Sequence, residues 1–489
     1  MKTMKTLVGV AALFWSAILL TAVCVATEDE PEYIYHTPQN ALLATLSDDA
    51  LDAVTDLIGA EDMVRNQLQA LKENGVDLND AAVSNQVTNL AEAAIAQVAV
   101  VEQDGGAVVV NRARIEETGE DETSLADRVS YAAEQIRAVL LSEGFEESRP
   151  IRTMVTFRPQ TESFQPVVAE VAGDTLSTVV DVVRIQAPKF SLLINVRKLE
   201  DDFRDSGTGS LRFTARAIEG SANVLGTVSQ VEVTLPDSGI FSPVYLCLPA
   251  FREAAEFLTM RNLSSEDSEQ AVTSFYDAVS GCLYTMVMES GVYSLSSHSP
   301  LFSDIDGLPQ EMREAIETLS VQDIIRGYAD GTFRPFNSVT RAHFVAFTLR
   351  AMGRDKDLHR DTNFSDVPRN SWCYHVVSNA EKLGLIKGIR PDFFGANYPI
   401  NSTQIYIVTG RVLNYWDYPI PKNYLAILQK AFSTGFETYS KETQEWLALS
   451  TSRALVLEQT DKIFNGQVVL NRGNVAVVTN RLRGKGPNG

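Results

Sequence analysis

Arg341 occupies the first turn of an expected helix near the C-terminus, where it could capture an anion. It follows Thr340, a residue type that caps helix N-termini. A cation in the first turn opposes the helix dipole, so Arg341 needs another reason to be there. A guanidinium offers paired donors that suit a carboxylate. The alternative is that Arg341 pairs with a carboxylate of the chain itself and only holds a turn.

The residues before Arg341 predict the turn that positions it. Gly327, Asp330 and Gly331 supply a tight bend, and Phe333 and Pro335 follow directly. Glycine and aspartate favour the backbone conformations that such bends require. The arginine is therefore expected at a junction between a turn and a helix.

This segment resembles the S-layer homology module, which tethers exported bacterial proteins to cell-wall polysaccharide. The resemblance rests on Phe302–Ile305 (FSDI), on Gly327–Pro335 (GYADGTFRP) and on Thr340-Arg341-Ala342, with His343 where the family usually has glutamate. It implies that three such units pack as an all-α pseudo-threefold bundle, with sugar bound in grooves between neighbouring units.

Three helix starts repeat along the C-terminal region. They begin at Thr340, Asn401 and Asn471, so their spacings are 401−340 = 61 and 471−401 = 70. Each is followed by an arginine ten residues later and by apolar residues at helical spacing. Asn363–Val367 repeats the opening in the second unit, while Trp372 and Trp446 mark the expected first helices of units two and three.

The resemblance implies the binding residues one position at a time. It makes Arg341 and Arg472 ligand contacts, with Asp304, Gly331 and Thr332 shaping the first groove, and the ligand an anionic, pyruvylated polysaccharide. Trp372 could stack on a sugar ring, or it could belong to the core. Unit two has Ser402 in place of the arginine and only a remnant of the turn at Asp392–Gly395; unit three has only Phe464-Asn465-Gly466. One or two grooves are therefore expected to bind.

The N-terminus indicates export. Lys2 and Lys5 precede an apolar run from Leu7 to Leu20, and small residues follow, which is typical of a signal peptide ending near residue 26. Lipid attachment at Cys24 is disfavoured because valine precedes the cysteine. The expected location is the cell wall or surface layer, with no membrane contact after cleavage.

Charge is distributed unevenly along the chain. Residues 301–489 hold 22 Lys and Arg against 19 Asp and Glu, a net charge of +3; the whole chain is −21, so residues 1–300 carry −21 − 3 = −24. So acidic a body argues against nucleic acid as a partner. Acidic surfaces are also common in secreted proteins, so the asymmetry alone does not identify a function.

The residues before 301 fall into two regions with different patterns of apolar residues. Residues 62–73, 82–101 and 125–140 repeat apolar positions at helical spacing, whereas ten short runs rich in β-branched residues between 151 and 295 are broken by turn residues. Asp277–Gly281 and Glu289–Gly291 are predicted hairpin turns. We therefore predict a multidomain α+β chain: a signal peptide (1–26), a mainly helical domain (27–145), a β-sandwich (146–300), and units at 301–354, 360–414 and 418–483.

No catalytic motif, metal-ligand cluster or cofactor fingerprint is present in the sequence. Cys247 and Cys282 could pair, leaving Cys373 over. We interpret the chain as a non-enzymatic surface protein with a structural or adhesive body, bound noncovalently to cell-wall glycan. Two alternatives stay open: a wall-anchored hydrolase, since paired carboxylates cannot be selected by sequence, or a lattice component whose degenerate units bind other surface proteins.

The sequence also predicts the behaviour of a double variant. Replacing both Arg341 and Arg472 with alanine should weaken wall binding markedly and leave thermal unfolding nearly unchanged. Unimpaired binding by this variant would remove both residues from the site.

Overall fold

Two large hydrophobic clusters organise the chain in the computed structural model. It describes residues 33–34, 56–79, 83–118, 123–147, 149–207, 209–220, 229–237, 240, 242, 244–250, 258–264, 271–277, 280–297, 302–355, 361–432, 435–459 and 468–484. One cluster runs from Ala60 to Tyr293 and the other from Ile305 to Leu482. The predicted signal peptide and Phe464-Asn465-Gly466 lie outside the described residues. None of the described helices is both long and apolar enough to cross a membrane.

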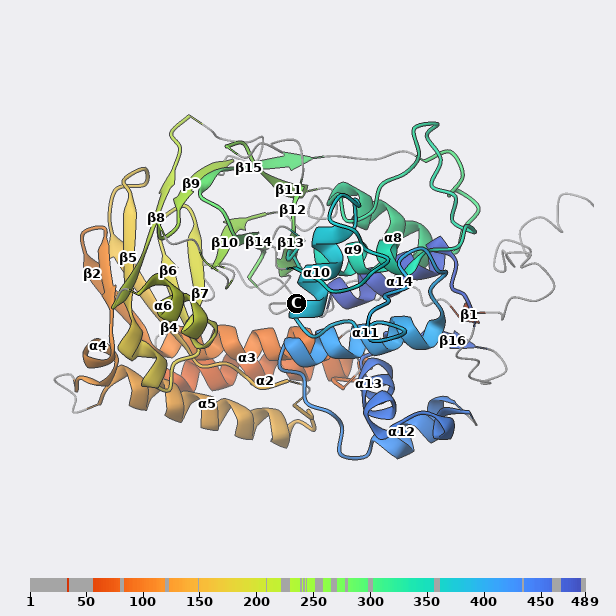
Figure 1. Ribbon diagram of the computed structural model, residues 1–489. Helices are drawn as coiled ribbons and strands as arrows, with labels where there is room; N and C mark the ends of the chain where they lie inside the picture. Colours follow the sequence, from red (N-terminus) through yellow and green to blue (C-terminus); the bar gives the residue numbers. More distant parts are fainter. Residues whose placement is uncertain are drawn as a thin grey trace, which may run out of the picture.

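Three helices form one layer of the body, which comprises the described residues up to 297. They are α2 (Leu57–Glu73), α3 (Ser84–Val98) and α5 (Leu125–Ser142). Asp56 caps α2, and Ser124 forms a capping box with Asp127 at the start of α5. Gly75 adopts φ +75° directly after α2, as its place behind Asn74 predicts. Figure 1 shows these helices lying beneath the strands.

Two seven-stranded mixed sheets form most of the rest of the body, which also has the short helices α4 (Arg112–Glu116) and α6 (Glu200–Ser206). Their orders are β13-β14-β10-β7-β6-β4-β2 and β12-β11-β15-β9-β8-β5-β3. All ten predicted strands are present, and β2, β3 and β11 are additions to them. The helix predicted over 82–101 ends at Val98, and β2 begins at Val100. The bounds are β2 Val100–Asp104, β3 Ala107–Val110, β4 Met154–Gln160, β5 Val167–Ala172, β6 Val182–Gln186, β7 Ser191–Asn195, β8 Ser210–Ala217, β9 Gln230–Thr234, β10 Val244–Pro249, β11 Leu258–Asn262, β12 Ala271–Val272, β13 Ser274–Asp277, β14 Cys282–Val287 and β15 Gly291–Ser297.

The sheets join the two regions that the sequence separated at residue 145. Strand β2 pairs parallel with β4, and β3 pairs parallel with β5, so each sheet contains one strand from the N-terminal region. The first hydrophobic cluster likewise spans α2, α3, α5 and both sheets. Helical and sandwich parts therefore share one core, in a mixed α+β body.

One predicted hairpin is confirmed and the other is wrong. Strands β13 and β14 pair antiparallel from Asp277 and Cys282, with Asp277 accepting from the Ser280 N–H at 3.1 Å. At Glu289–Gly291, by contrast, β14 and β15 belong to different sheets, because Gly291 pairs with Val233 of β9. The turn signal was real, but the chain crosses between sheets there.

The C-terminal bundle contains seven α-helices in its described residues. Thr340, Asn401 and Asn471 each accept a hydrogen bond from the backbone N–H three residues later, as predicted for N-caps, and Gln404 completes a capping box in the second unit. The helices are α8 (Gln310–Val321), α9 (Arg341–Ala351), α10 (Tyr374–Lys382), α11 (Ser402–Tyr415), α12 (Tyr424–Ala431), α13 (Lys441–Ser452) and α14 (Arg472–Arg483).

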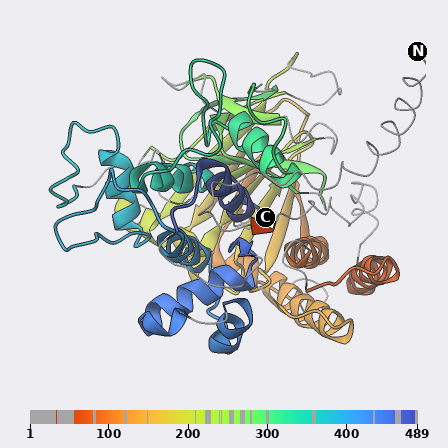
Figure 2. The same cartoon turned by 90° about the vertical axis from the view of Figure 1, so that its right-hand side faces the viewer.

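The bundle packs against the outer face of the first sheet. Met286, Cys247 and Tyr245 belong to a small cluster on this face. Polar contacts cross the same junction: the Thr273 hydroxyl donates to the Arg350 carbonyl at 2.6 Å, and Arg483 Nη1 donates to the Ser274 carbonyl at 3.1 Å. Viewed from the bundle side, the blue and teal helices lie in front of the strands (Figure 2).

The three described cysteines are free thiols. Cys247 and Cys282 lie on neighbouring strands, but Cys247 pairs with Tyr284 and Cys282 with Pro249, so they are not opposite each other. Burial raises the pKa of Cys247 well above its usual value. The pairing of Cys247 with Cys282, left open by the sequence, is not formed in this structure.

Candidate functional site

The segments that precede α9, α11 and α14 hydrogen-bond to one another in a closed ring. Three isolated bridges connect them: Thr340 with Pro399, Asn401 with Val469, and Asn471 with Ser338. In each bridge, the N-cap residue of one helix meets the residue two positions before the N-cap of another. The start of each helix therefore lies beside the turn of a different unit.

The ring occupies the first backbone N–H groups of α9 and α14. The N–H of Arg341 donates to the Tyr398 carbonyl at 2.9 Å, and the N–H of Arg472 donates to the Asn337 carbonyl at 2.7 Å. The next N–H groups, of Ala342 and Gly473, also donate to carbonyls, those of Ala396 and Pro335. At these two helices the first-turn N–H groups hold neighbouring turns, which leaves the side chains as the donors for any ligand.

Two aspartates fold the turns that receive the arginines. Asp304 accepts from the N–H groups of Phe333 and Arg334 at 2.8 and 2.7 Å. Asp366, its counterpart in the second unit, accepts from three successive N–H groups that begin at Phe394, at 2.7 to 2.8 Å. Asp304 therefore acts indirectly. It fixes the backbone of Phe333, and Arg472 stacks on the Phe333 ring.

Arg341 stacks on the second turn. Its side chain is 7% exposed, and its guanidinium carbon lies 4.6 Å from the centre of the Phe394 ring. Nε donates to the Phe394 carbonyl at 3.0 Å and Nη2 to the Lys387 carbonyl at 3.1 Å. Burial lowers the pKa of Arg341 to about 10, which leaves it charged at neutral pH. Arg341 does hold a turn, but through carbonyls and an aromatic ring rather than through a carboxylate.

Arg472 repeats this arrangement on the first turn. Its guanidinium carbon lies 4.5 Å from the centre of the Phe333 ring and 5.4 Å from that of Tyr328. Nη2 donates to the carbonyl of Arg326, and the buried Nε has no hydrogen-bond partner among the described residues. Burial lowers its pKa. In the described chain, neither Arg341 nor Arg472 forms an ion pair with a carboxylate.

A cavity of about 250 Å³ lies beside Arg341. Two further cations line it, Lys387 from the second turn and Arg411 from α11, together with Gln404. Glu442 lies 3.0 Å from Lys387 and 3.9 Å from Arg411, and it is about half exposed. The other lining residues are Val345, Ile386, Gly388, Ile389, Phe394, Ile400, Ile407 and Val408. The cavity thus combines an apolar wall with clustered guanidinium and ammonium groups.

Trp372 is a surface residue rather than a core residue. Its side chain is 55% exposed, and its ring centre lies 4.7 Å from that of His343. The Thr340 hydroxyl lies 2.7 Å from His343 Nδ1. Burial, followed by the charges of Arg472 and Arg350, lowers the pKa of His343 and keeps it neutral at pH 7. Trp372 is therefore an accessible aromatic face close to the Arg472 side of the ring.

Gly331 and Thr332 stabilise the first turn. Gly331 adopts φ +79°, which only glycine takes readily, and the Thr332 hydroxyl donates to Asp330 Oδ1 at 2.6 Å. Arg334 pairs with Asp330 at 2.8 Å, and its guanidinium carbon lies 4.0 Å from the centre of the Tyr328 ring. Both predicted residues thus act through the shape of the turn.

The third position of the ring differs from the other two. Ser402 replaces the arginine, and its N–H donates to the Val468 carbonyl at 2.8 Å. The backbone of β16 (Glu458–Gln459) pairs antiparallel with that of β1 (Tyr33–Ile34). Among the described residues, this position of the ring therefore has no basic side chain in the first turn of its helix.

Replacing Asp304 with alanine should weaken the bundle by about 1–2 kcal/mol. The Phe333 N–H is partly buried and would lose its acceptor, whereas the Arg334 N–H is exposed and can bond to water. Urea unfolding of the variant would measure the loss. The control is Asp306→Ala, which removes an exposed carboxylate from the same segment and should change the free energy of unfolding by less than about 0.5 kcal/mol; equal losses in both variants would contradict the assigned role.

The sequence analysis did not identify the aromatic rings on which the two arginines stack, or the basic side chains around those rings. Phe333 and Phe394 are fully buried beneath the arginines, and Lys387, Arg411 and His343 lie around them. The repeat register contains a signal for them, because Phe394 and Lys387 lie 61 residues after Phe333 and Arg326. Superposing the units at their N-caps would have placed these pairs at equivalent sites.

Comparison with known proteins finds similarity to one domain family in the segment that contains Arg341. The sequence model of the S-layer homology domain matches residues 301–345. A cellulosome-anchoring protein of Acetivibrio thermocellus is 41% identical over 75 residues, covering 15% of this chain and 16% of that protein. A cell surface protein of Thermoanaerobacter kivui is 29% identical over 152 residues, covering 30% and 19%. An amylopullulanase of Thermoanaerobacterium thermosulfurigenes is 31% identical over 112 residues, covering 23% and 6%.

These similarities cover short parts of long proteins. The chain spans less than one fifth of the length of each of these three relatives. The matched family segment contains the Asp304 turn and the Arg341 helix start described above. The chain therefore carries an S-layer homology domain at residues 301–345.

Proposed function

We propose that residues 301–483 form three S-layer homology units around a pseudo-threefold axis and tether the protein noncovalently to a bacterial cell wall. The closed ring of bridges supports this arrangement, because each unit contributes one helix start and one acceptor segment. The ligand is an anionic, pyruvylated wall polysaccharide, and the protein is exported to the cell surface. Relatives named as a cell surface protein and a cellulosome-anchoring protein support that location.

One observation carries the proposal: two guanidinium groups are packed on aromatic rings without a carboxylate in contact. Arg341 and Arg472 donate only to carbonyls among the described residues, so Asp366 and Asp304 act on their charges without touching them. Lys387 and Arg411 add charge beside Arg341. A carboxylate on a sugar would supply the missing counter-charge, and the apolar wall would contact the ring.

Two grooves on one chain would retain the protein better than one. Each site is small, with a cavity of about 250 Å³ at Arg341, and is expected to bind weakly alone. A polysaccharide presents its acidic groups repeatedly, so binding at one groove raises the effective concentration at the second. Ser402 makes a third groove the weakest candidate.

The test is sedimentation of the full chain with purified walls, before and after chemical removal of the wall polysaccharide. The chain should sediment with intact walls and stay in solution with stripped walls. Equal sedimentation with both would contradict glycan capture and favour assembly with other surface proteins.

Trp372→Ala should reduce wall binding by about two- to tenfold, which corresponds to the loss of one aromatic stacking contact. Because Trp372 is 55% exposed, thermal unfolding should change little. The matched control is Tyr131→Ala, which removes an aromatic ring of 58% exposure from α5. If both variants bind walls like the wild type, Trp372 is not a ligand contact.

We also propose that the body has a structural or adhesive role and is not an enzyme. The relatives include an amylopullulanase, but its similarity covers only 6% of that protein. A zymogram on purified walls decides the matter. Release of soluble sugar or peptide by the full chain would overturn this part of the proposal and leave the anchoring part intact.

A further inference from the structure

A cavity of about 530 Å³ lies where the body meets the bundle. Its walls come from the segments around Arg149 and Lys198 and from strand β10 on the body side, and from the ends of α9 and α11 on the bundle side. Its volume lies in the range of pockets that hold small molecules. It is separate from the cavity beside Arg341, with which it shares no lining residue.

The cavity is positively charged in a strongly acidic chain. Five basic side chains line it, against three acidic ones, Asp181, Asp201 and Asp417. Glu92 lies behind Arg149 and Arg152 and adds a fourth negative charge, which leaves an excess of one positive charge, 5 − 4 = 1. The whole chain, by comparison, carries −21. The basic residues are Arg149, Arg152, Arg197, Lys198 and Arg354. An inverted local charge of this kind favours an anion inside the cavity.

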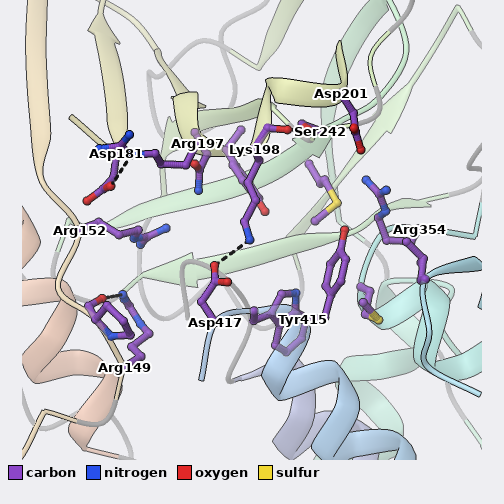
Figure 3. A pocket seen from close by; sticks show the side chains of 17 residues that line it. Arg149, Arg152, Asp181, Arg197, Lys198, Asp201, Ser242, Arg354, Tyr415 and Asp417 are labelled. Carbon is purple, nitrogen blue, oxygen red and sulfur yellow. Dashed lines mark hydrogen bonds and ion pairs between the residues drawn. The ribbon is translucent and has the colours of Figure 1, made fainter. Parts of the chain in front are cut away.

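The cations are held in fixed positions around the space. Arg149 and Arg152 both contact Glu92, at 2.5 Å each, so two guanidinium groups share one carboxylate. Arg197 pairs with Asp181 at 3.1 Å, and Lys198 with Asp417 at 2.7 Å across the junction. Figure 3 shows Arg149 and Arg152 on one side of the space and Arg354 on the other. Such positioning lowers the ordering cost of binding.

Three polar atoms of the lining residues have no partner among the described residues. They are the hydroxyl of Tyr245, which is 4% exposed, Oδ1 of Asn195, and Nε of Arg149. Buried polar groups are usually satisfied, so unpartnered ones beside a cavity indicate a missing ligand or water. Burial raises the pKa of Tyr245, so its hydroxyl remains protonated and can donate as well as accept.

The remaining wall is apolar and partly aromatic. Tyr415 and Trp416 at the end of α11, Met286 of β14 and Met352 after α9 all line the space. An aromatic wall opposite fixed cations suits a ligand that has an anionic group at one end and a ring at the other. The unpartnered oxygens of Tyr245 and Asn195 suit a ligand that carries hydroxyl groups.

We propose that this cavity binds a small hydroxylated anion, a sugar acid or a sugar phosphate of monosaccharide size. The anionic group lies among Arg152, Lys198 and Arg354, and ligand hydroxyls satisfy Tyr245 and Asn195. Because the cavity has walls from both parts of the chain, the bound ligand also fastens the body to the bundle.

Calorimetric titration of the full chain tests this with glucuronate and glucose 6-phosphate, and with glucose as the uncharged control. At least one anion should bind and raise the melting temperature, and glucose should do neither. The two arms distinguish a carboxylate from a phosphate. Absence of binding by both anions at 10 mM (about the weakest range calorimetry resolves), or equal binding of glucose, would overturn the proposal.

Substitutions locate the binding. Tyr245→Phe removes an unpartnered hydroxyl, so the unliganded protein should be no less stable while affinity falls about five- to tenfold. Lys198→Gln should weaken anion binding by a similar factor. The matched control is Tyr293→Phe. The Tyr293 hydroxyl donates to the Glu289 carbonyl at 2.7 Å, and Tyr293 does not line the cavity, so this variant should bind the anions like the wild type.

A groove variant separates this proposal from wall anchoring. If Trp372→Ala lowers affinity for the small anion and Tyr245→Phe does not, the anion binds in the groove, and the cavity assignment is wrong while the anchoring proposal gains support. If Tyr245→Phe lowers affinity for the small anion but wall sedimentation is unchanged, the two sites are independent, as we infer.

Discussion

Replacing Glu92 with alanine should lower the free energy of unfolding of the body by about 3–5 kcal/mol, because two buried guanidinium groups would lose their carboxylate partner. Glu92 is 4% exposed on α3 and contacts Arg149 and Arg152 at 2.5 Å each. Its Oε1 also accepts from the Arg152 backbone N–H at 3.0 Å. Urea unfolding followed by circular dichroism measures the loss.

Glu102→Ala is the matched control for this variant. Glu102 pairs with Arg158 at 3.6 Å, but its side chain is 57% exposed. Exposed ion pairs contribute little, so the expected change is below about 1 kcal/mol. If Glu92→Ala cost no more than Glu102→Ala, the buried triad would not be a structural centre of the body.

The same triad predicts a dependence of stability on pH. Burial raises the pKa of Glu92, but the two arginines outweigh it and lower the pKa from 4.5 to about 2. The folded pKa lies below the unfolded one, so the stabilisation is complete above pH 4.5 and is lost as the pH falls toward 2. This lowering of the pKa corresponds to about 3 kcal/mol of stabilisation. Glu92→Gln should lack this component of the acid transition.

The sequence predicted the local features of the bundle well. N-caps such as Thr340, Asn401 and Asn471 are decided by residues within one helical turn, so their types and spacing are sufficient. The positive φ angles of Gly75 and Gly331 are likewise decided by the residues next to them. Both kinds of feature follow from short-range sterics and hydrogen bonding.

Long-range pairing was not predictable in the same way. Strand β2 pairs with β4 more than fifty residues away, and such register depends on the folded core. The acid at Glu92 lies on the buried side of α3, four residues after buried Thr88. An isolated carboxylate within an apolar stripe indicates a buried partner, but only the folded structure shows which residue that partner is.

The position of Arg341 explains how one side chain can serve folding and binding. Its carbonyl contacts satisfy backbone acceptors of the second turn without neutralising its charge. A carboxylate partner in the chain would have given the same architecture and left no reason for an anion to bind. Stacking on Phe394 fixes the guanidinium plane beside the cavity, so the ligand is not required to order it.

Arg341→Ala should therefore both destabilise the bundle, by about 2–4 kcal/mol, and weaken wall binding. The buried hydrogen bond to the Phe394 carbonyl and the partly buried one to the Lys387 carbonyl would both lose their donor, and the Phe394 ring would lose its cation. This revises the expectation from sequence that removing the arginines leaves unfolding unchanged. Thermal unfolding and wall sedimentation of the same preparation measure the two effects.

A lysine separates the two effects. Arg341→Lys keeps the charge but lacks the planar fork, so it should recover part of the stability while wall binding stays reduced. The matched control is Arg390→Ala, which removes an exposed arginine stacked at 4.7 Å on Phe393 outside the cavity and should preserve both properties. Wild-type wall binding by a folded Arg341→Lys variant would show that the ligand detects only charge at this position. Wild-type binding by folded Arg341→Ala would remove Arg341 from the groove altogether, because the cavity would then hold the glycan without the cation that defines it.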